Sequence, residues 1–160
     1  MAHDDLRVRR KSSFASTPGI RSRMQQQKMR DTKPELALRR ALHARGLRYR
    51  LDQAVVPGTR RRVDIVFSRS RIAVFVDGCF WHGCEEHRGT LPTVNTWYWP
   101  TKISGNRARD SDTDLRLRSE GWLVLRFWEH EDVDAAADRI ALAVRTRAGE
   151  TPGRGTPASR

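Results

Sequence analysis

Apolar residues recur along the chain at two different spacings, and these spacings predict the order of helices and strands. Spacings of three and four residues, typical of helices, are found in the segments 34–45, 103–120 and 133–146. Runs and alternations typical of strands are found in the segments 47–51, 63–67, 72–76 and 122–128. The resulting order, α-β-β-β-α-β-α, predicts an α/β or α+β fold in which a sheet is flanked by helices.

Turn and cap residues support several of these boundaries. Thr32 and Glu35 have the spacing of a helix capping box, with Pro34 in the first turn, and Gly46 is placed to end that helix. The run 72–76 is apolar throughout, which is typical of a central strand buried on both faces. We therefore expect this buried strand to lead directly into the polar, reactive loop that follows it.

The charge of the chain is strongly positive and unevenly distributed. The formal net charge is +12, and residues 1–30 hold eight Lys and Arg against two Asp. This balance points to a polyanionic partner such as nucleic acid, although basic tails are also common solubilising segments. We expect a disordered basic arm at residues 1–20, one folded domain at 21–146 and a disordered tail at 147–160.

The sequence contains two cysteines, Cys79 and Cys84. They are five positions apart, so a disulfide between them would close a small loop and add little stability. We see neither an apolar leader at the N-terminus nor an apolar run long enough to span a bilayer. These features predict a soluble, intracellular protein, in which a cysteine pair is more often a metal site than a disulfide.

Two acidic residues are associated with neighbouring predicted strands. Asp64 faces away from the main apolar side of the strand 63–67, and Asp77 follows the strand 72–76. A hairpin between these strands would bring the two carboxylates together, and oxygen ligands of this kind suit Mg²⁺. The alternative is a solvent-facing Asp64 on an edge strand, neutralised by the arginines at 60–62.

Candidate zinc ligands follow directly after Asp77. Cys79, Cys84 and His87 form the pattern Cys-x4-Cys-x2-His, which favours zinc over the alternative of inert thiols and surface histidines. Tetrahedral zinc needs a fourth ligand, for which His130 and His82 both compete. If His82 is not a ligand, its place near the acids suits acid–base chemistry, the alternative being a packed or surface histidine.

Large aromatic residues occur in segments that we expect to be irregular. They are Phe80, Trp81, Trp97, Tyr98 and Trp99. In so basic a chain they favour side chains that wedge between base pairs, and the alternative is a small packed layer over the sheet.

The second predicted helix carries polar residues along one face. Asn106, Asp110 and Asp114 are spaced four apart, so their side chains lie on the same side. Leu115 and Leu117 offer apolar surface elsewhere on this helix.

These blocks together resemble the very short patch repair (Vsr) endonucleases, within the restriction-endonuclease-like superfamily. The matching blocks run in family order from about residue 22 to 144: Met29–Thr32 with Glu35, Arg62–Asp64, Phe75–His82, Lys102–Ile103 with Asn106 and Arg109–Asp110, Gly121–Trp122 and Trp128–Glu129. The Gly-Cys-Phe-Trp-His run within them is highly specific. The resemblance implies a restriction-endonuclease-like core with a central mixed sheet of four or more strands and a structural zinc loop.

The resemblance also implies a reaction and a set of site residues. The reaction would be a Mg²⁺-dependent, strand-specific nick in duplex DNA, 5′ to the T of T:G mismatches left by deamination of 5-methylcytosine. Asp64 and the Val76 carbonyl match Mg²⁺ contacts, and His82 matches the acid–base residue, with Glu35 in support. Further matches are Asn106 and Asp110 near the metal-bound waters, the structural zinc ligands Cys79, Cys84, His87 and His130, and the duplex-opening aromatics Phe80, Trp81 and Trp99.

Some positions depart from the family pattern. Some members carry His in place of Asp77, so this acid is either a direct metal ligand or a substitute for a phosphate contact. Cys84 and His87 stand where other members show His and Cys, and His130 stands where a Cys can occur. Each exchange keeps a competent zinc ligand. No Lys follows Asp77, in agreement with the family's lack of the catalytic Lys found in most related nucleases.

Other functions fit the same residues. The first is a related restriction-type or general DNA nuclease with a different specificity. The second is a zinc-stabilised DNA-binding protein without activity, although binding alone would need neither Asp64 nor His82. The resemblance further implies a monomer that acts on mismatched duplex DNA, with mismatch-repair proteins as candidate partners. Its expected location is the bacterial cytoplasm, in association with the nucleoid and away from membranes.

Overall fold

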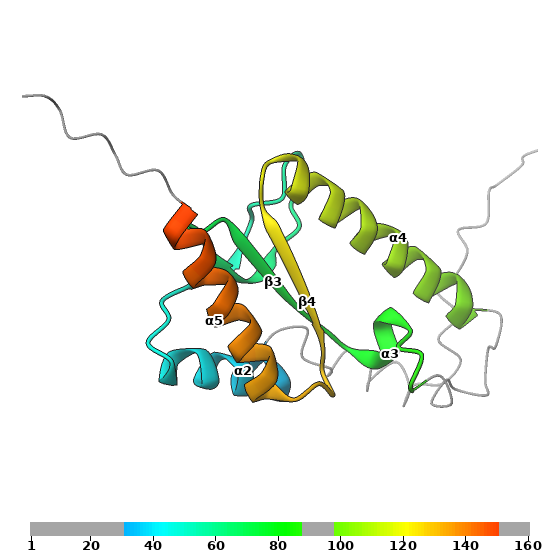
Figure 1. The fold of residues 1–160 in the computed structure, drawn as a ribbon. Helices are drawn as coiled ribbons and strands as arrows, with labels where there is room; N and C mark the ends of the chain where they lie inside the picture. Colours follow the sequence, from blue (N-terminus) through cyan, green and yellow to red (C-terminus); the bar gives the residue numbers. More distant parts are fainter. Residues whose placement is uncertain (1–30, 88–97, 151–160) are drawn as a thin grey trace, which may run out of the picture.

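The computed structural model describes residues 31–87 and 98–150, where four strands form one sheet with helices on both sides (Figure 1). The elements, in chain order, are α2 (Lys33–Ala44), β1 (Arg50–Gln53), β2 (Val63–Phe67), β3 (Ile72–Asp77), α3 (Cys79–His82), α4 (Tyr98–Ser119), β4 (Leu123–Trp128) and α5 (Val133–Glu150). The predicted order is confirmed, with one short helix, α3, where a loop was expected. Our expectations for the basic arm, for Trp97 and for the last ten residues lie outside the described ranges.

The sheet is mixed, with the strand order β1-β2-β3-β4. β2 pairs antiparallel with β1 and with β3, whereas β3 and β4 are parallel, so that Asp77 lies beside Trp128 where both strands end. β3 is an inner strand and its first four residues are buried, as its apolar run predicted. β2 is also an inner strand, and the alternative of Asp64 on a solvent-facing edge is therefore wrong.

Helix α2 begins as the capping pattern predicted. The Thr32 side chain accepts the N–H of Glu35 at 3.4 Å. The Glu35 carboxylate reaches back to the N–H of Asp31 at 3.0 Å, one residue earlier than in a standard capping box. Gly46 follows the helix with a φ of 72°, a left-handed conformation that glycine adopts without a steric penalty.

The limits of β1 and α5 differ from those predicted. β1 begins at Arg50 rather than at residue 47, because the Leu47 N–H donates to the carbonyl of Leu42 and so closes α2. α5 runs to Glu150, past the expected domain end at 146. The guanidinium of Arg147 donates to three backbone carbonyls in the turns before β3 and β4, which ties the end of α5 to the sheet.

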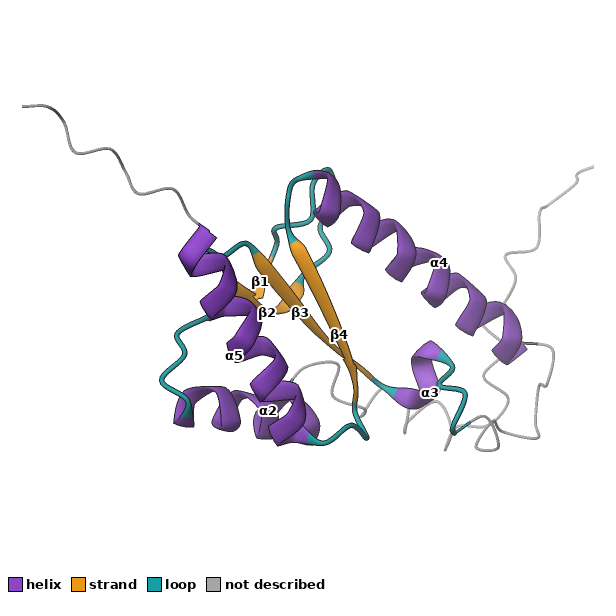
Figure 2. Ribbon diagram, in the orientation of Figure 1, coloured by secondary structure: helices purple, strands orange, loops and turns teal. Residues whose placement is uncertain are grey.

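Helices cover both faces of the sheet (Figure 2). Apolar side chains fill the space on each face. α2 and α5 pack on one face, through Leu38, Leu42, Ala136, Ala137 and Ile140 against Ile65, Phe67, Ile72, Val74 and Phe127. The opposite face packs through Val56, Val63, Val66, Ala73, Phe75, Val124 and, from α4, Leu117. Leu117 is thus buried as expected, whereas Leu115 is 66 % exposed and contributes nothing to the core.

Helix α4 begins earlier than predicted and is fixed by polar contacts. It starts at Tyr98 rather than near Ile103, so part of the aromatic segment that we expected to be irregular is helical. Arg61 ties this helix to the segment before β2, donating to Asp112 at 2.6 Å and to Thr113 at 2.9 Å. Among the helices of the described ranges, none has the combined length and apolar character needed to cross a membrane.

Candidate active site and metal centre

The Asp64 carboxylate lies against the end of β3. Its Oδ2 accepts the N–H of Val76 at 2.9 Å. Burial raises the pKa of Asp64 to about 6; the hydrogen bond from Val76 opposes the shift, whereas the charges of Glu35 and Asp77 add to it. A carboxylate that shares its surroundings with two other acids is a suitable cation ligand, because a bound cation would stabilise its charged form.

The Val76 carbonyl lies on the same side of β3 as Asp64. The N–H and C=O of one strand residue leave the same edge of the strand, and the Val76 N–H points to Asp64. The structure therefore brings together the two Mg²⁺ contacts that the resemblance implied. Both are oxygen donors, and this donor set fits Mg²⁺, which prefers oxygen ligands.

Asp77 is the last residue of β3 and is bound by Arg126 of β4. The Nη1 of Arg126 donates to both carboxylate oxygens at 2.9 Å. Burial raises the pKa of Asp77, against the opposing charges of Arg126 and His82. The side chain expected to be a metal ligand or a phosphate contact is thus held in an internal ion pair.

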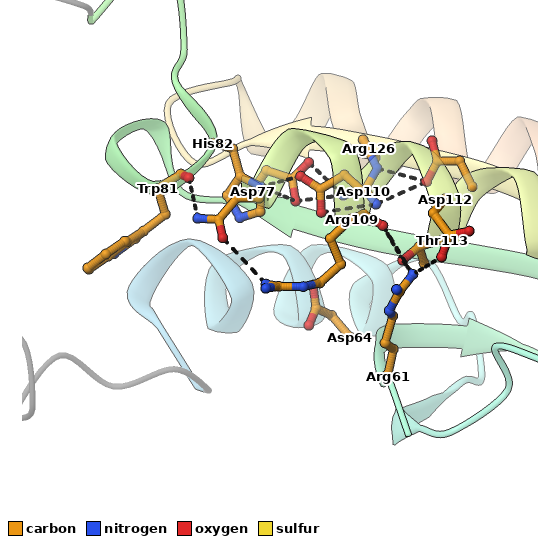
Figure 3. A network of polar contacts seen from close by, with 12 residues as sticks. Arg61, Asp64, Asp77, Trp81, His82, Arg109, Asp110, Asp112, Thr113 and Arg126 are labelled. Atoms are coloured by element: carbon orange, nitrogen blue, oxygen red, sulfur yellow. Dashed lines mark hydrogen bonds and ion pairs between the residues drawn. The ribbon is translucent and has the colours of Figure 1, made fainter. Parts of the chain in front are cut away.

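His82 ends the short helix α3 and is held by Asp110 of α4 (Figure 3). Its Nδ1 lies 2.6 Å from Oδ2 of Asp110 and 3.9 Å from Oδ1 of Asp77. Burial would lower the pKa of His82, but the Asp110 hydrogen bond and the two acidic charges raise it above its usual value. An ionised carboxylate only accepts, so Nδ1 carries the proton and Nε2 is left for proton exchange.

The polar residues of α4 lie on one face, as the four-residue spacing predicted, and this face points toward the site. Asn106 is buried and donates to the backbone carbonyl of Trp81 at 2.7 Å. One turn later Asp110 holds His82, and after another turn Asp114 accepts from Arg126 at 3.0 Å.

Glu35 is buried at the start of α2 and faces a different part of the site from the one expected. Its described hydrogen bonds are with Thr32, the N–H of Asp31 and Arg39, and none of them reaches His82. Its negative charge acts instead on Asp64, whose pKa it helps to raise. In this structure Glu35 thus acts electrostatically on the carboxylate that would hold Mg²⁺.

The four predicted zinc ligands form one cluster. The sulfur atoms of Cys79 and Cys84 and one ring nitrogen each of His87 and His130 all lie within 4.8 Å of one another. Donor atoms around tetrahedral zinc lie about 3.3–3.8 Å apart, given bonds of about 2.0–2.3 Å, so this set fits zinc. His130 belongs to the cluster and His82 does not, which favours His130 as the fourth ligand.

Two glutamates support this cluster from outside. Glu86 lies 3.1 Å from Nε2 of His130, which leaves Nδ1 of that ring to face the sulfur of Cys79 at 3.0 Å. Glu129 accepts the N–H of Cys79 at 2.8 Å. Burial, with the neighbouring Cys84 and Glu129, raises the pKa of Cys79 to about 12, a shift that a coordinated cation would reverse.

The described aromatic residues pack against one another where α3 meets the start of α4. Phe80 contacts Trp81 and Trp99 edge to face, each at 5.0 Å between ring centroids. Trp99 is only 5 % exposed, whereas Phe80 and Trp81 are half-buried. Trp99 thus packs as a base for the other two rings, and Phe80 and Trp81 keep surface that a partner can contact.

Comparison with known proteins identifies relatives of this chain. The model of the family described as DNA mismatch endonuclease Vsr matches residues 15–88. The type II nicking enzyme V.NaeI of Lentzea aerocolonigenes is 46% identical over 125 residues, which cover 77% of this chain and 73% of that protein. The chain belongs to the Vsr family.

Other relatives extend this likeness along the chain. The type II nicking enzyme V.NmeDIP of Neisseria meningitidis serogroup C is 42% identical over 138 residues, covering 83% of this chain and 91% of that protein. The DNA mismatch endonuclease Vsr of Escherichia coli strain K12 is 38% identical over 100 residues, 62% of each chain. Membership of the Vsr family makes this chain a DNA endonuclease with a restriction-endonuclease-like core.

Several residues of this Vsr-family site were not predicted from the sequence. Arg126, which binds Asp77, and Glu86 were not singled out, and Glu129 was named only within a block that resembles the family. Asp114 was placed on the correct helix face but given no role. The one available signal was the register of parallel strands, which sets position 126 beside Phe75, two residues before Asp77.

Proposed function

We propose that this Vsr-family endonuclease nicks one strand of duplex DNA on the 5′ side of the T in T:G mismatches that arise from 5-methylcytosine, in a reaction that needs Mg²⁺. One observation carries the proposal. The Asp64 carboxylate accepts the N–H of Val76 at the end of β3, on the strand edge from which the Val76 carbonyl also leaves. Next to this edge, Asp77 lies 3.9 Å from His82.

In the proposed mechanism Asp64 and the Val76 carbonyl hold Mg²⁺, which supplies Lewis-acid activation of the phosphate group when bound. His82 exchanges a proton through Nε2, because Asp110 occupies its other ring nitrogen. Asn106 holds the backbone of Trp81, the residue before His82, and so limits movement of the imidazole. Glu35 adds negative charge beside Asp64, which favours cation binding.

Phe80 and Trp81 are the proposed wedge at the mismatch. Unstacking a base step costs about a few kcal/mol, so a wedge needs a base that does not yield. Trp99 supports both rings, at 5.0 Å from Phe80 and 6.4 Å from Trp81. Zn²⁺ held by Cys79, Cys84, His87 and His130 would add a second support by fastening α3 to the end of β4.

Nicking assays on matched oligonucleotide duplexes test the specificity. The duplexes carry T:G, T:A, C:G or another mismatch at one position, each with and without Mg²⁺, and the product end is mapped on each strand. We expect one nick, 5′ to the T, on the T:G duplex with Mg²⁺. Equal rates on paired DNA would identify a restriction-type or general nuclease, and binding without product would identify an inactive DNA-binding protein.

The proposed setting of the reaction follows from the same family. We place the enzyme in the cytoplasm, acting as a monomer on chromosomal DNA alongside mismatch-repair proteins. Its flanking-base preference would mirror a cytosine methyltransferase of the same cell, and T:G duplexes with randomised flanks would measure that preference.

A further inference from the structure

Arg126 joins three carboxylates, two of which lie beside the candidate acid–base histidine. It lies on β4, and its guanidinium donates to Asp77 of β3 at 2.9 Å. It also donates to Asp114 at 3.0 Å and lies 3.6 Å from Oδ1 of Asp110, both on α4. The guanidinium stacks over the Phe75 ring at 4.3 Å, so its plane is fixed from the side of the sheet as well.

The contacts of Arg126 continue to His82 by two routes (Figure 3). Asp110 uses Oδ2 for Nδ1 of His82, while its Oδ1 faces Arg126. Asp77 is held by Arg126 through both oxygens, and its Oδ1 lies 3.9 Å from the same Nδ1. The two acids nearest the protonated side of the imidazole are therefore both held in place by one guanidinium.

Electrostatics gives this arrangement its effect. Asp77, Asp110 and Asp114 are three acids in partly buried surroundings, where like charges repel more strongly than in water. The guanidinium compensates this charge and sets the direction of each carboxylate, because its donors form a rigid fork. Without it, Asp110 would have no fixed partner for Oδ1 and could rotate away from His82.

We propose that Arg126 is a positioning residue, which orients His82 by holding Asp77 and Asp110 around it. This inference rests on the proposed role of His82 in nicking. It also assigns a role to Asp77, whose two oxygens are engaged by Arg126. Asp77 anchors the guanidinium and is not a metal ligand in this arrangement.

The test compares Arg126→Gln with Arg139→Gln in the zinc-loaded protein. Arg139 is a matched control, since it also stacks over a phenylalanine, Phe127 at 4.9 Å, and pairs with Glu131, but it lies on α5. We expect Arg126→Gln to lower kcat for nicking T:G duplex by about tenfold or more, by analogy with the loss seen when groups that orient metal ligands are removed. The Kd for DNA should stay within about twofold, because the lost interaction is made within the protein. Arg126→Lys should restore part of kcat.

A spectroscopic readout separates positioning from general stability. The Nδ1–H proton of His82 is assigned by ¹H–¹⁵N NMR with His82→Gln as the reference. In Arg126→Gln we expect this proton to shift or to broaden through exchange with water, and in Arg139→Gln to keep its position. This measurement needs no activity, so it still tests the positioning role if wild-type enzyme proves not to nick T:G duplex, an outcome that would contradict only the proposed function.

Several results would overturn the inference. They are wild-type kcat in folded Arg126→Gln, an equal loss of kcat in Arg139→Gln, or an unchanged His82 resonance in Arg126→Gln. If Arg126→Gln does not fold, the pair Asp77→Asn with Arg126→Gln removes one charge of each sign, so that neither charge is left without its partner. A folded double variant with the wild-type His82 resonance would also overturn the inference, whereas a displaced resonance would support it.

Discussion

Asp64 is placed where its ionised form is unfavourable in the folded chain. Burial, with the charges of Glu35 and Asp77, raises its pKa from 3.8 to about 6. An acid with a raised folded-state pKa binds its proton more tightly in the folded than in the unfolded chain. The free energy of unfolding therefore falls as pH rises from about 4 to about 6, and it stays lowered at neutral pH.

Asp64→Asn should consequently raise stability while it abolishes nicking. The amide oxygen still accepts the Val76 N–H, but the charge that would hold Mg²⁺ is lost. Near neutral pH without Mg²⁺ we expect the free energy of unfolding to increase by about 1–3 kcal/mol, measured by denaturant titration. Asp138→Asn is the control with the opposite sign, because its pKa is lowered by Arg45. Nicking by Asp64→Asn at the wild-type rate would contradict the role of Asp64.

The proposed site residues differ in how far the sequence could reveal them. Asp64, His82 and the three candidate zinc ligands of the 79–87 segment lie in compact local motifs, so residue types and spacing made them candidates, and the resemblance to the Vsr endonucleases supplied their expected roles. Arg126 acts on Asp77, 49 positions away, and no local pattern connects the two. Its place became visible only when the parallel pairing of β3 and β4 set their ends side by side.

Among the elements, the strands and the main helices followed from apolar spacing, whereas α3 and the start of α4 did not. α3 has only four residues, too few to show a helical period. Pro100 suggested an irregular segment, yet it lies in the first turn of α4, where the missing N–H would have no partner within the helix. Both misses fall where aromatic packing and the metal cluster, rather than helix propensity, determine the backbone.

The end of α3 offers a test of how tightly it packs against α4. Gly83 has a φ of 66°, and a Cβ at this position would lie 2.6 Å from Cγ2 of Ile103. Gly83→Ala should therefore lower the free energy of unfolding by about 1–3 kcal/mol, measured by denaturant titration. Gly105→Ala is the matched control on α4, because nothing lies within 4 Å of its Cβ. We expect this control to stabilise the protein by about 0.5–1 kcal/mol. Equal stability of the two variants would show that α3 and α4 do not pack as described.

The candidate zinc cluster connects α3 to the segment after β4, and removing one of its donors should loosen that connection. His130→Gln takes away one of the four donors and leaves the charge of Glu86 without its partner. We expect zinc content to fall by elemental analysis, with a lower Tm and slower nicking, because His82 ends α3. His43→Gln, on the exposed side of α2, should keep full zinc and wild-type Tm. Full zinc in His130→Gln would identify a different fourth ligand.

At the scale of the whole molecule, the sheet separates two unlike sides. α2 and α5 cover one face and pack on it through aliphatic side chains. The candidate site lies instead at the C-terminal ends of β3 and β4, beside α4. It gathers the acid cluster, His82, the aromatic residues and the polar face of α4. We therefore expect DNA that reaches Asp64 and His82 to lie along α4, with its phosphates near the arginines of this helix rather than those of α5.

This orientation predicts unequal effects of two arginine substitutions. Arg107 is exposed on α4 and donates to the Gly83 carbonyl at 3.3 Å, which places it next to His82 and the proposed wedge. Arg145 is equally exposed but lies on α5. Each phosphate contact contributes about 0.9 to the slope of log affinity against log salt concentration. Arg107→Gln should therefore weaken binding to all duplexes and reduce this slope by about 1, whereas Arg145→Gln should change neither.

Fluorescence anisotropy over a salt series, without Mg²⁺ so that no nick forms, measures both quantities. A smaller slope for Arg145→Gln and an unchanged slope for Arg107→Gln would contradict this placement of the DNA along α4.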